Sequence, residues 1–188
     1  MINKQKRAKR ITSILTIGLT IYFQFFCFNS FAQGLWTRKA DFGGCARNVA
    51  VGFSINNLGY IGTGHYRDSA NNNFSLKDFW EYDPVTDAWT QRADFGGGLR
   101  DNAAGFSVGS YGYIGTGEDD VMGSFYNDLW RYSPSSNTWT QRANFPGGAR
   151  YWAVGFSSAT KGYLGTGSMV STNTFKKDFW EYNPTTNV

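Results

Sequence analysis

A segment of about 50 residues occurs three times in this 188-residue chain, and this repetition limits the fold more than any other feature. The copies align on Trp36, Trp89 and Trp139, which gives periods of 53 and 50 residues. An arginine follows each tryptophan by 11 residues, a phenylalanine by 17, and a Gly-Thr-Gly triplet begins at 26. A fixed period of this size predicts one structural unit that is built repeatedly, because each copy buries its faces against its neighbours.

Each repeat contains four short segments rich in aromatic and β-branched residues and bounded by Gly, Asn, Pro and Ser, with no helical periodicity between them. In the first repeat the expected strands are 48–55, 59–64, 78–84 and 88–95. The difference in period lies in one variable segment per repeat, which we expect to be a surface loop outside the regular structure. The variable segments are 65–77, 118–127 and 168–177.

The repeat resembles a Kelch repeat in its glycine pair at the end of the second strand, its tyrosine in the third and its tryptophan in the fourth. The residues concerned are Gly62, Gly64, Gly115, Gly117, Gly165 and Gly167, then Tyr82, Tyr132 and Tyr182, and finally Trp36, Trp89 and Trp139. The resemblance covers Trp36 to Val188, although the adjacent glycine pair of the family is here Gly-Thr-Gly. It implies an all-β, Kelch-type β-propeller in which these residues maintain the fold. We expect Trp89 and Trp139 to pack on the glycine-rich second strand of their own blade.

The repeats predict three four-stranded blades, of which the third is incomplete. The expected parts are a closing strand at 34–42 and blades at 47–95, 100–145 and 150–188. Propellers typically have four to eight blades, so the sequence predicts the N-terminal part of a six- or seven-bladed propeller. The alternative is a half-propeller that pairs with a second copy, and open blade edges predict self-association in either case.

The first 32 residues predict a secretory signal peptide. Five basic residues precede an apolar stretch from Ile11 to about Phe28, and small residues at Ser30 and Ala32 predict cleavage after Ala32. A retained membrane anchor and a lipid anchor at Cys27 are less favoured alternatives. We therefore expect a secreted, periplasmic or cell-surface protein with no membrane partner after cleavage.

The basic character of the sequence belongs to this leader. The remaining residues carry 13 basic and 14 acidic side chains, a net charge of about −1, which argues against a nucleic-acid partner. Cys45 is then the only cysteine, so the fold has to be stabilised by packing without an intrachain disulfide.

Arg47, Arg100 and Arg150 each open the innermost strand of a blade, which in Kelch-like propellers lies at the mouth of the central channel. A ring of guanidinium groups there would bind carboxylates, such as those of acidic sugars. The favoured interpretation is structural, because residues present in every repeat usually maintain the repeat. In that case each arginine forms an ion pair with a repeated aspartate. The aspartates are Asp78, Asp128 and Asp178.

Recognition is expected where the repeats differ. The candidate ligand-binding residues that follow the arginines are Asn48, Asp101, Tyr151 and Trp152. The leading hypothesis is a non-catalytic module that binds a glycan or a protein through loops at the channel mouth. Another hypothesis is a structural or adhesive cell-surface module.

Catalysis has little support in the sequence. The alternative is a carbohydrate-active enzyme with its site in the central channel. The Kelch resemblance implies this option, because sialic acid epimerases of the Kelch type and galactose oxidase contain a propeller of this kind. The copper site of galactose oxidase needs several histidines and a cysteine-linked tyrosine, and this chain offers only His65 and Cys45. We expect no catalytic residue, no metal site and no cofactor, and we interpret Glu118-Asp119-Asp120 as a solvated turn.

Overall fold

The computed structural model describes residues 34–188, which form strands and one short 3-10 helix, η1 (Val170–Thr172). This part of the chain is all-β, as the sequence predicts. It divides into a short unit that ends at Thr37 and a second unit, Arg38–Val188, which holds every strand. The expected signal peptide and Cys27 lie outside the described residues. No helix in residues 34–188 has the length and apolar character needed to cross a membrane.

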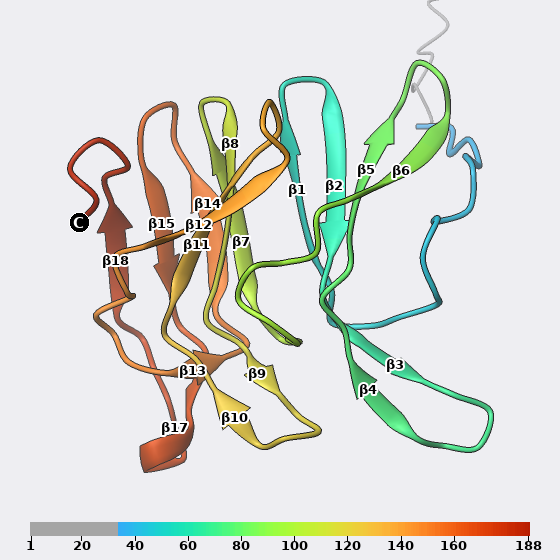
Figure 1. Cartoon of the computed structure of the whole chain (residues 1–188). Coiled ribbons are helices and arrows are strands. Elements are labelled where there is room, and N and C mark those ends of the chain that lie inside the picture. The colour runs from blue at the N-terminus through green and yellow to red at the C-terminus, as the bar shows by residue number, and fades with distance from the viewer. Residues whose placement is uncertain (1–33) are drawn as a thin grey trace, which may run out of the picture. The chain divides into compact units, whose positions relative to one another are not determined.

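Three antiparallel sheets, one for each repeat, stand side by side in chain order (Figure 1). Sheet 1 has the order β1-β2-β5-β6, and sheet 2 repeats it as β7-β8-β11-β12. Sheet 3 has the order β14-β15-β18, and no fourth strand pairs with β18 among the described residues. The strands of sheet 1 are β1 (Val51–Ile55), β2 (Leu58–Gly62), β5 (Phe79–Asp83) and β6 (Ala88–Arg92). Those of sheet 2 are β7 (Ala104–Val108), β8 (Tyr111–Gly115), β11 (Leu129–Ser133) and β12 (Thr138–Arg142). Those of sheet 3 are β14 (Val154–Ser157), β15 (Gly162–Gly165) and β18 (Phe179–Tyr182).

The sheets pack face to face through a phenylalanine that lies on a glycine of the next repeat. The ring of Phe53 on β1 occupies the space that a Cβ atom at Gly112 on β8 would take. Phe106 on β7 lies on Gly162 of β15 in the same way. A side chain at either glycine would displace a ring, so the second strand has to stay flat there. This repeated contact buries the centre of the molecule and is consistent with a β-propeller-like fold.

The Gly-Thr-Gly triplet joins one repeat to the next. The last glycine of the first triplet, Gly64, has φ +100° and donates its N–H to the carbonyl oxygen of Arg100 at 2.8 Å. Gly117 donates to Arg150 at the same distance. A positive φ costs glycine little, so the main chain can turn there towards the following repeat.

The expected packing of Trp89 and Trp139 on the glycine-rich second strand is wrong. In sheets 1 and 2 the third strand lies between the second and the fourth, so the tryptophan of the fourth strand packs elsewhere. The ring of Trp139 lies 5.0 Å, between centroids, from the rings of Phe79, Phe95 and Tyr132. Two of these rings come from the preceding repeat. The tryptophan therefore stabilises the junction between repeats rather than a single sheet.

A turn residue with positive φ also fixes this junction. Asn137 has φ +52°, and its Oδ1 accepts hydrogen bonds from the Ala93 N–H at 2.9 Å and from the Tyr132 hydroxyl at 2.9 Å. The Trp139 indole N–H donates to the Ala93 carbonyl oxygen at 3.1 Å. The corresponding turn residues in the other repeats, Asp87 and Asn187, bind a backbone N–H and a tyrosine hydroxyl in the same way.

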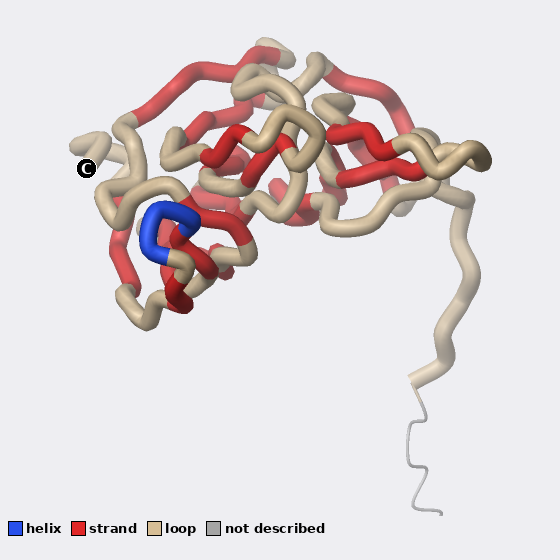
Figure 2. Tube along the Cα trace, turned by 90° about the horizontal axis from the view of Figure 1, so that it is seen from below, coloured by secondary structure: helices blue, strands red, loops and turns tan. Residues whose placement is uncertain are grey.

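The variable segments are not irregular loops, which corrects the prediction for 65–77, 118–127 and 168–177. Each forms a short antiparallel hairpin, because its two ends are held at a fixed separation by the sheet below. Figure 2 views the molecule from the side of these hairpins, with η1 in blue. The hairpin strands are β3 (His65–Arg67), β4 (Asn73–Ser75), β9 (Glu118–Asp119), β10 (Ser124–Phe125), β16 (Ser168–Met169) and β17 (Thr174–Phe175). β13 (Arg150–Tyr151) pairs with β16 of the third hairpin.

The strand expected at 34–42 is not formed. Its last part packs on sheet 1, where the Phe42 ring lies 4.9 Å from Trp89 and 5.9 Å from Trp80. A strand needs main-chain hydrogen bonds to a neighbouring strand, and none joins residues 34–42 to another strand of the described part of the chain.

Candidate functional site

The three repeated arginines form ion pairs and hydrogen bonds with other residues of the sheets. Arg100 is fully buried, and its Nη1 and Nη2 atoms both donate to the Asp128 carboxylate, with Nη2 3.0 Å from Oδ2. The guanidinium also donates to the carbonyl oxygens of Thr116 at 3.1 Å and Gly97 at 2.8 Å. Asp128 accepts a further hydrogen bond from the Trp130 indole at 2.8 Å. The group is therefore surrounded by acceptors of its own repeat.

The same arrangement occurs in the other two repeats, which confirms the predicted ion pairs. Arg47 Nη2 lies 2.6 Å from Asp78 Oδ2, and Arg150 Nη2 lies 2.9 Å from Asp178 Oδ2. The hydrogen bond from Arg150 lowers the pKa of the Asp178 carboxyl to about 2. A guanidinium that already faces a carboxylate is not free to bind the carboxylate of a ligand. The arginines therefore hold the inner ends of the sheets.

The variable residue after each arginine lies opposite the first residue of the hairpin in its own repeat. Asn48 bridges His65, Asp101 bridges Glu118, and Tyr151 pairs with Ser168. These three pairs have the same backbone geometry and different side chains. The structure thus brings the predicted residues Asn48, Asp101 and Tyr151 to one end of the sheets, next to the hairpins.

The next residue in each repeat has a left-handed backbone. The φ angles are +47° at Val49, +51° at Asn102 and +57° at Trp152. The Asn102 N–H donates to the Val49 carbonyl oxygen at 3.3 Å, and the Trp152 N–H donates to the Asn102 carbonyl oxygen at 3.1 Å. Left-handed conformations are unfavourable for a β-branched or bulky residue, and such strain is concentrated at functional sites. We call these three residues the inner ladder.

Asn102 is the centre of the inner ladder. Its amide nitrogen donates to Asp101 Oδ1 and to Glu118 Oε1, both at 2.9 Å, and its Oδ1 accepts the Trp152 indole N–H at 2.8 Å. Every polar atom of the Asn102 side chain therefore has a partner. The result is a fixed orientation for the indole ring of the next repeat.

Trp152 is held in place and yet exposed. Its relative exposure is 56%, and its ring centroid lies 4.5 Å from that of Tyr151 at an interplanar angle of 67°. Tyr151 in turn lies 5.8 Å from Phe125 of the second hairpin. An exposed aromatic ring with a fixed orientation is a surface for stacking against an apolar ligand face.

The acidic side chains near Trp152 are buried, so the interpretation of Glu118-Asp119-Asp120 as a solvated turn is wrong for the first two residues. Glu118 and Asp119 form β9, and their exposures are 9% and 4%. Asp101 is 1% exposed and accepts a hydrogen bond from the Ser75 hydroxyl at 3.1 Å. Burial raises the pKa of both the Asp101 and the Glu118 carboxyl groups. Asp101 thus supports Asn102 instead of presenting a free carboxylate.

No group of three or more His, Cys, Asp or Glu side chains in residues 34–188 is arranged to hold a metal ion. Cys45 is a free, exposed cysteine. His65 lies opposite Asn48 in a backbone bridge, as described above.

Sequence reasoning missed Asn102 and Glu118. Asn102 could have been found from the alignment of the repeats, because it follows Arg100 by two residues and corresponds to Trp152. Glu118 was assigned to a solvated turn. The sequence did not predict the backbone conformation at these positions, because Val, Asn and Trp share no preference for a left-handed turn.

No protein-family model matches the chain, and no curated protein matches it. A solved structure of a protein named YjhT is similar in fold, with a TM-score of 0.68 and 18% sequence identity. The match covers 79% of this chain and 53% of YjhT, so the chain spans about half the length of that structure. The likeness supports a propeller-like arrangement of the sheets.

Proposed function

We propose that this chain is part of a Kelch-type β-propeller that acts outside the cytoplasm as a non-catalytic module, binding a neutral glycan at Trp152 and the hairpins beside it. The observation that supports the proposal is the indole of Trp152, which is exposed, strained in its backbone and fixed by Asn102. A sugar ring presents C–H groups that stack on the negative face of an aromatic ring. Its hydroxyl groups need polar partners, which the backbone of the neighbouring hairpins offers at the rim.

The charges favour a neutral ligand over an acidic one. The three arginines are paired with aspartates. The Trp152 indole binds Asn102, which in turn binds the buried carboxyls of Asp101 and Glu118. A carboxylate on the ligand would meet acidic neighbours, and the three repeated arginines are already paired with aspartates. This reverses the preference for acidic sugars that an arginine ring would give.

The enzyme alternative depends on the same carboxyl pair. A carboxyl group with a raised pKa is what general acid catalysis requires, and perturbed values are common at active sites. The burial of Asp101 and Glu118 argues against this role, because a substrate has to reach the proton that is transferred. The pair is better explained as support for Asn102.

Binding to an array of neutral and sialylated oligosaccharides, followed by calorimetry with the strongest ligand, tests the proposal. Trp152→Ala should weaken binding of a neutral glycan at least about tenfold, which corresponds to about 1.4 kcal/mol. Its melting temperature should stay close to that of the wild type, because the side chain is exposed.

Val85→Ala is the matched control, since Val85 is exposed in the turn between β5 and β6. This variant should bind like the wild type. Binding of sialylated glycans alone, or neutral binding that survives Trp152→Ala, would contradict the proposal. Turnover of a bound glycan would favour the enzyme alternative.

A further inference from the structure

One position in the third strand of the sheets changes its charge from repeat to repeat. It is occupied by Glu81 on β5 in sheet 1 and by Glu181 on β18 in sheet 3, but by Arg131 on β11 in sheet 2. A residue that only maintains the repeat is expected to be the same in every copy. The positive charge of Arg131 therefore needs an explanation specific to sheet 2.

In sheet 1 the carboxylate of Glu81 is bound by two donors of the chain. It accepts hydrogen bonds from the Tyr60 hydroxyl at 2.7 Å and from the Arg92 guanidinium at 2.5 Å. Glu81 lies opposite Thr90, and Arg92 lies opposite Phe79, so the two charged residues are diagonal neighbours on one face of the sheet. The negative charge of Glu81 is thus balanced within the chain.

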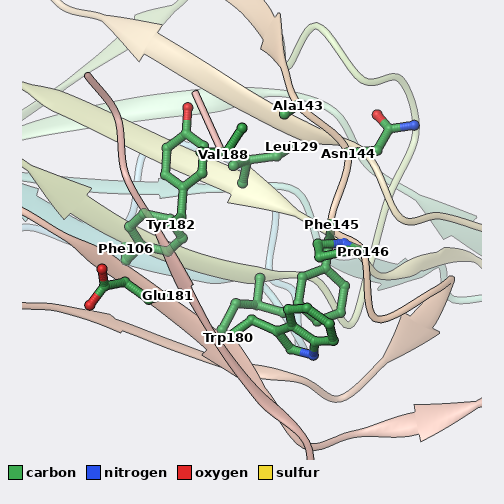
Figure 3. A pocket seen from close by; sticks show the side chains of 11 residues that line it. Phe106, Leu129, Ala143, Asn144, Phe145, Pro146, Trp180, Glu181, Tyr182 and Val188 are labelled. Atoms are coloured by element: carbon green, nitrogen blue, oxygen red, sulfur yellow. The ribbon is translucent and has the colours of Figure 1, made fainter. Parts of the chain in front are cut away.

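Glu181 in sheet 3 is also balanced within the chain. Its carboxylate accepts the Tyr163 hydroxyl at 3.0 Å and lies 3.0 Å from Lys161 Nζ. Glu181 and Tyr182 are consecutive in β18, so their side chains point to different sides of the strand (Figure 3). Tyr182 faces sheet 2, where its ring centroid lies 5.5 Å from that of Tyr113. Glu181 therefore faces away from sheet 2.

Sheet 2 retains the two donors and lacks the carboxylate. Tyr113 and Arg142 stand at the positions of Tyr60 and Arg92, and Arg131 is the diagonal neighbour of Arg142. Neither of these arginines forms an ion pair with a carboxylate of residues 34–188. Two like charges on neighbouring strands repel one another, and an anion between them would remove the repulsion.

Both guanidinium groups are held in position. Arg131 lies over the ring of Tyr111, 4.4 Å from its centroid, and its Nε atom is buried without a hydrogen-bond partner in the described part of the chain. A cation–π contact does not replace the acceptors that the N–H groups of a guanidinium need. Arg142 Nε donates to the Tyr182 hydroxyl at 3.3 Å. The cations are therefore oriented by aromatic residues and still lack an acidic partner.

A pocket of about 340 Å³ leads to these groups from the end of the sheets opposite to the hairpins. It is lined by Tyr111, Tyr113 and Arg131, and by the turns that contain Ser110 and Thr160. These turns connect β7 to β8 and β14 to β15, at the top of Figure 1. The pocket lies between two sheets that are both described, and it includes no residue of the proposed glycan site.

We propose that this pocket binds the carboxylate of a small hydroxy acid, with Arg131, Arg142 and the Tyr113 hydroxyl as donors. The carboxylate of the ligand takes the place of the one that the chain itself supplies in sheet 1. A guanidinium can form two parallel hydrogen bonds to a carboxylate, which favours this planar group over other anions. The hydroxyl groups of Ser110 and Thr160 at the rim offer partners for a hydroxyl group of the acid.

NMR titration of the arginine Nε–H signals tests the site, with the ionic strength held constant by sodium chloride. The probes are lactate, N-acetylglutamate and sulfate. Lactate should shift the Arg131 and Arg142 signals saturably and bind more tightly than the other two. Tighter binding of N-acetylglutamate would assign the pocket to an acidic side chain of a partner protein, and tighter binding of sulfate would indicate a different anion. Either result would overturn the proposal, as would the absence of a saturable shift.

Two substitutions of Arg131 separate binding from folding. Arg131→Glu introduces the residue of the other repeats and should weaken lactate binding at least about tenfold, measured at the Arg142 signal, because an internal carboxylate then occupies the site. It should melt no lower than the wild type, since an ion pair replaces two like charges. Arg131→Gln, which adds no carboxylate, should also weaken binding. Binding that is unchanged in both variants would overturn the proposal.

Arg38→Gln is the matched control, because Arg38 is an exposed arginine whose ion pair is also exposed. It should bind lactate like the wild type, and equal losses at Arg38 and Arg131 would show unspecific attraction of anions and overturn the proposal. Trp152→Ala should leave lactate binding unchanged, because Trp152 lies beside the hairpins at the other end of the sheets. The result for this pocket is therefore independent of the result for the glycan site.

Discussion

Replacing Arg100 by alanine should destabilise the protein far more than the loss of an ordinary ion pair. Arg100 is fully buried, whereas its partner Asp128 is largely buried and would keep only the Trp130 indole as a donor. The carbonyl oxygens of Thr116 and Gly97 would lose their donor as well. Removing one member of a buried pair costs about 3–5 kcal/mol, because the other charge is left without compensation.

The effect is measured by urea unfolding followed through tryptophan fluorescence. For a domain of this size, 3–5 kcal/mol corresponds to a fall in Tm of about 6–20 °C. Arg100→Lys should recover only part of the loss, since an ammonium group cannot form two parallel bonds to a carboxylate.

Arg38→Ala is the matched control for the same chemical change. Arg38 pairs with Asp41 at 2.9 Å, but both side chains are at least 80% exposed, and such pairs contribute about 0–1 kcal/mol. A loss of less than about 1 kcal/mol for Arg100→Ala, or equal losses at the two arginines, would refute the argument from burial.

Asp101→Asn should raise the free energy of unfolding at pH 7 and lose this advantage below about pH 4. Burial raises the pKa of Asp101, and its buried charge costs stability only where the carboxyl is ionised. Urea unfolding at both pH values measures the difference. The pH dependence from Asp178 has the opposite sign. Its pKa is lowered to about 2, so the stability from its pair with Arg150 is present above pH 4 and should fall as the pH approaches 2. An unfolding midpoint that stays unchanged down to pH 2 would contradict this. Trp139→Ala should lower the free energy of unfolding by about 3–5 kcal/mol, which is more than the loss from Trp89→Ala. Trp139 packs against three aromatic rings and Trp89 against two. Thermal melting of both variants shows which loss is larger.

The repeats made the sheets and the ion pairs predictable. Arg47, Arg100 and Arg150 recur at a fixed distance from a tryptophan, and a repeated aspartate is available in every copy. Opposite charges at constant positions in a repeat are explained most simply by a contact that every copy needs. The structure bears out this part of the reasoning in all three repeats.

The packing of the tryptophans could not be predicted in the same way. Trp139 occupies the outer edge of its sheet, and two of its three ring contacts, Phe79 and Phe95, come from the preceding repeat. Alignment shows which positions are equivalent, but it does not say whether a residue contacts its own repeat or the one before. The hairpins were missed because strands of two or three residues leave almost no periodicity to detect.

Two hydrogen bonds of the inner ladder join main-chain atoms of Val49, Asn102 and Trp152. A main-chain bond does not depend on which side chain the residue carries, so this joint tolerates any residue that accepts a left-handed backbone. Tandem duplication of a repeat would therefore preserve the joint and leave its side chain free to diverge. Val49, Asn102 and Trp152 are an example of this divergence. The third repeat has acquired an exposed indole at this position, and the main-chain connection between repeats is unchanged.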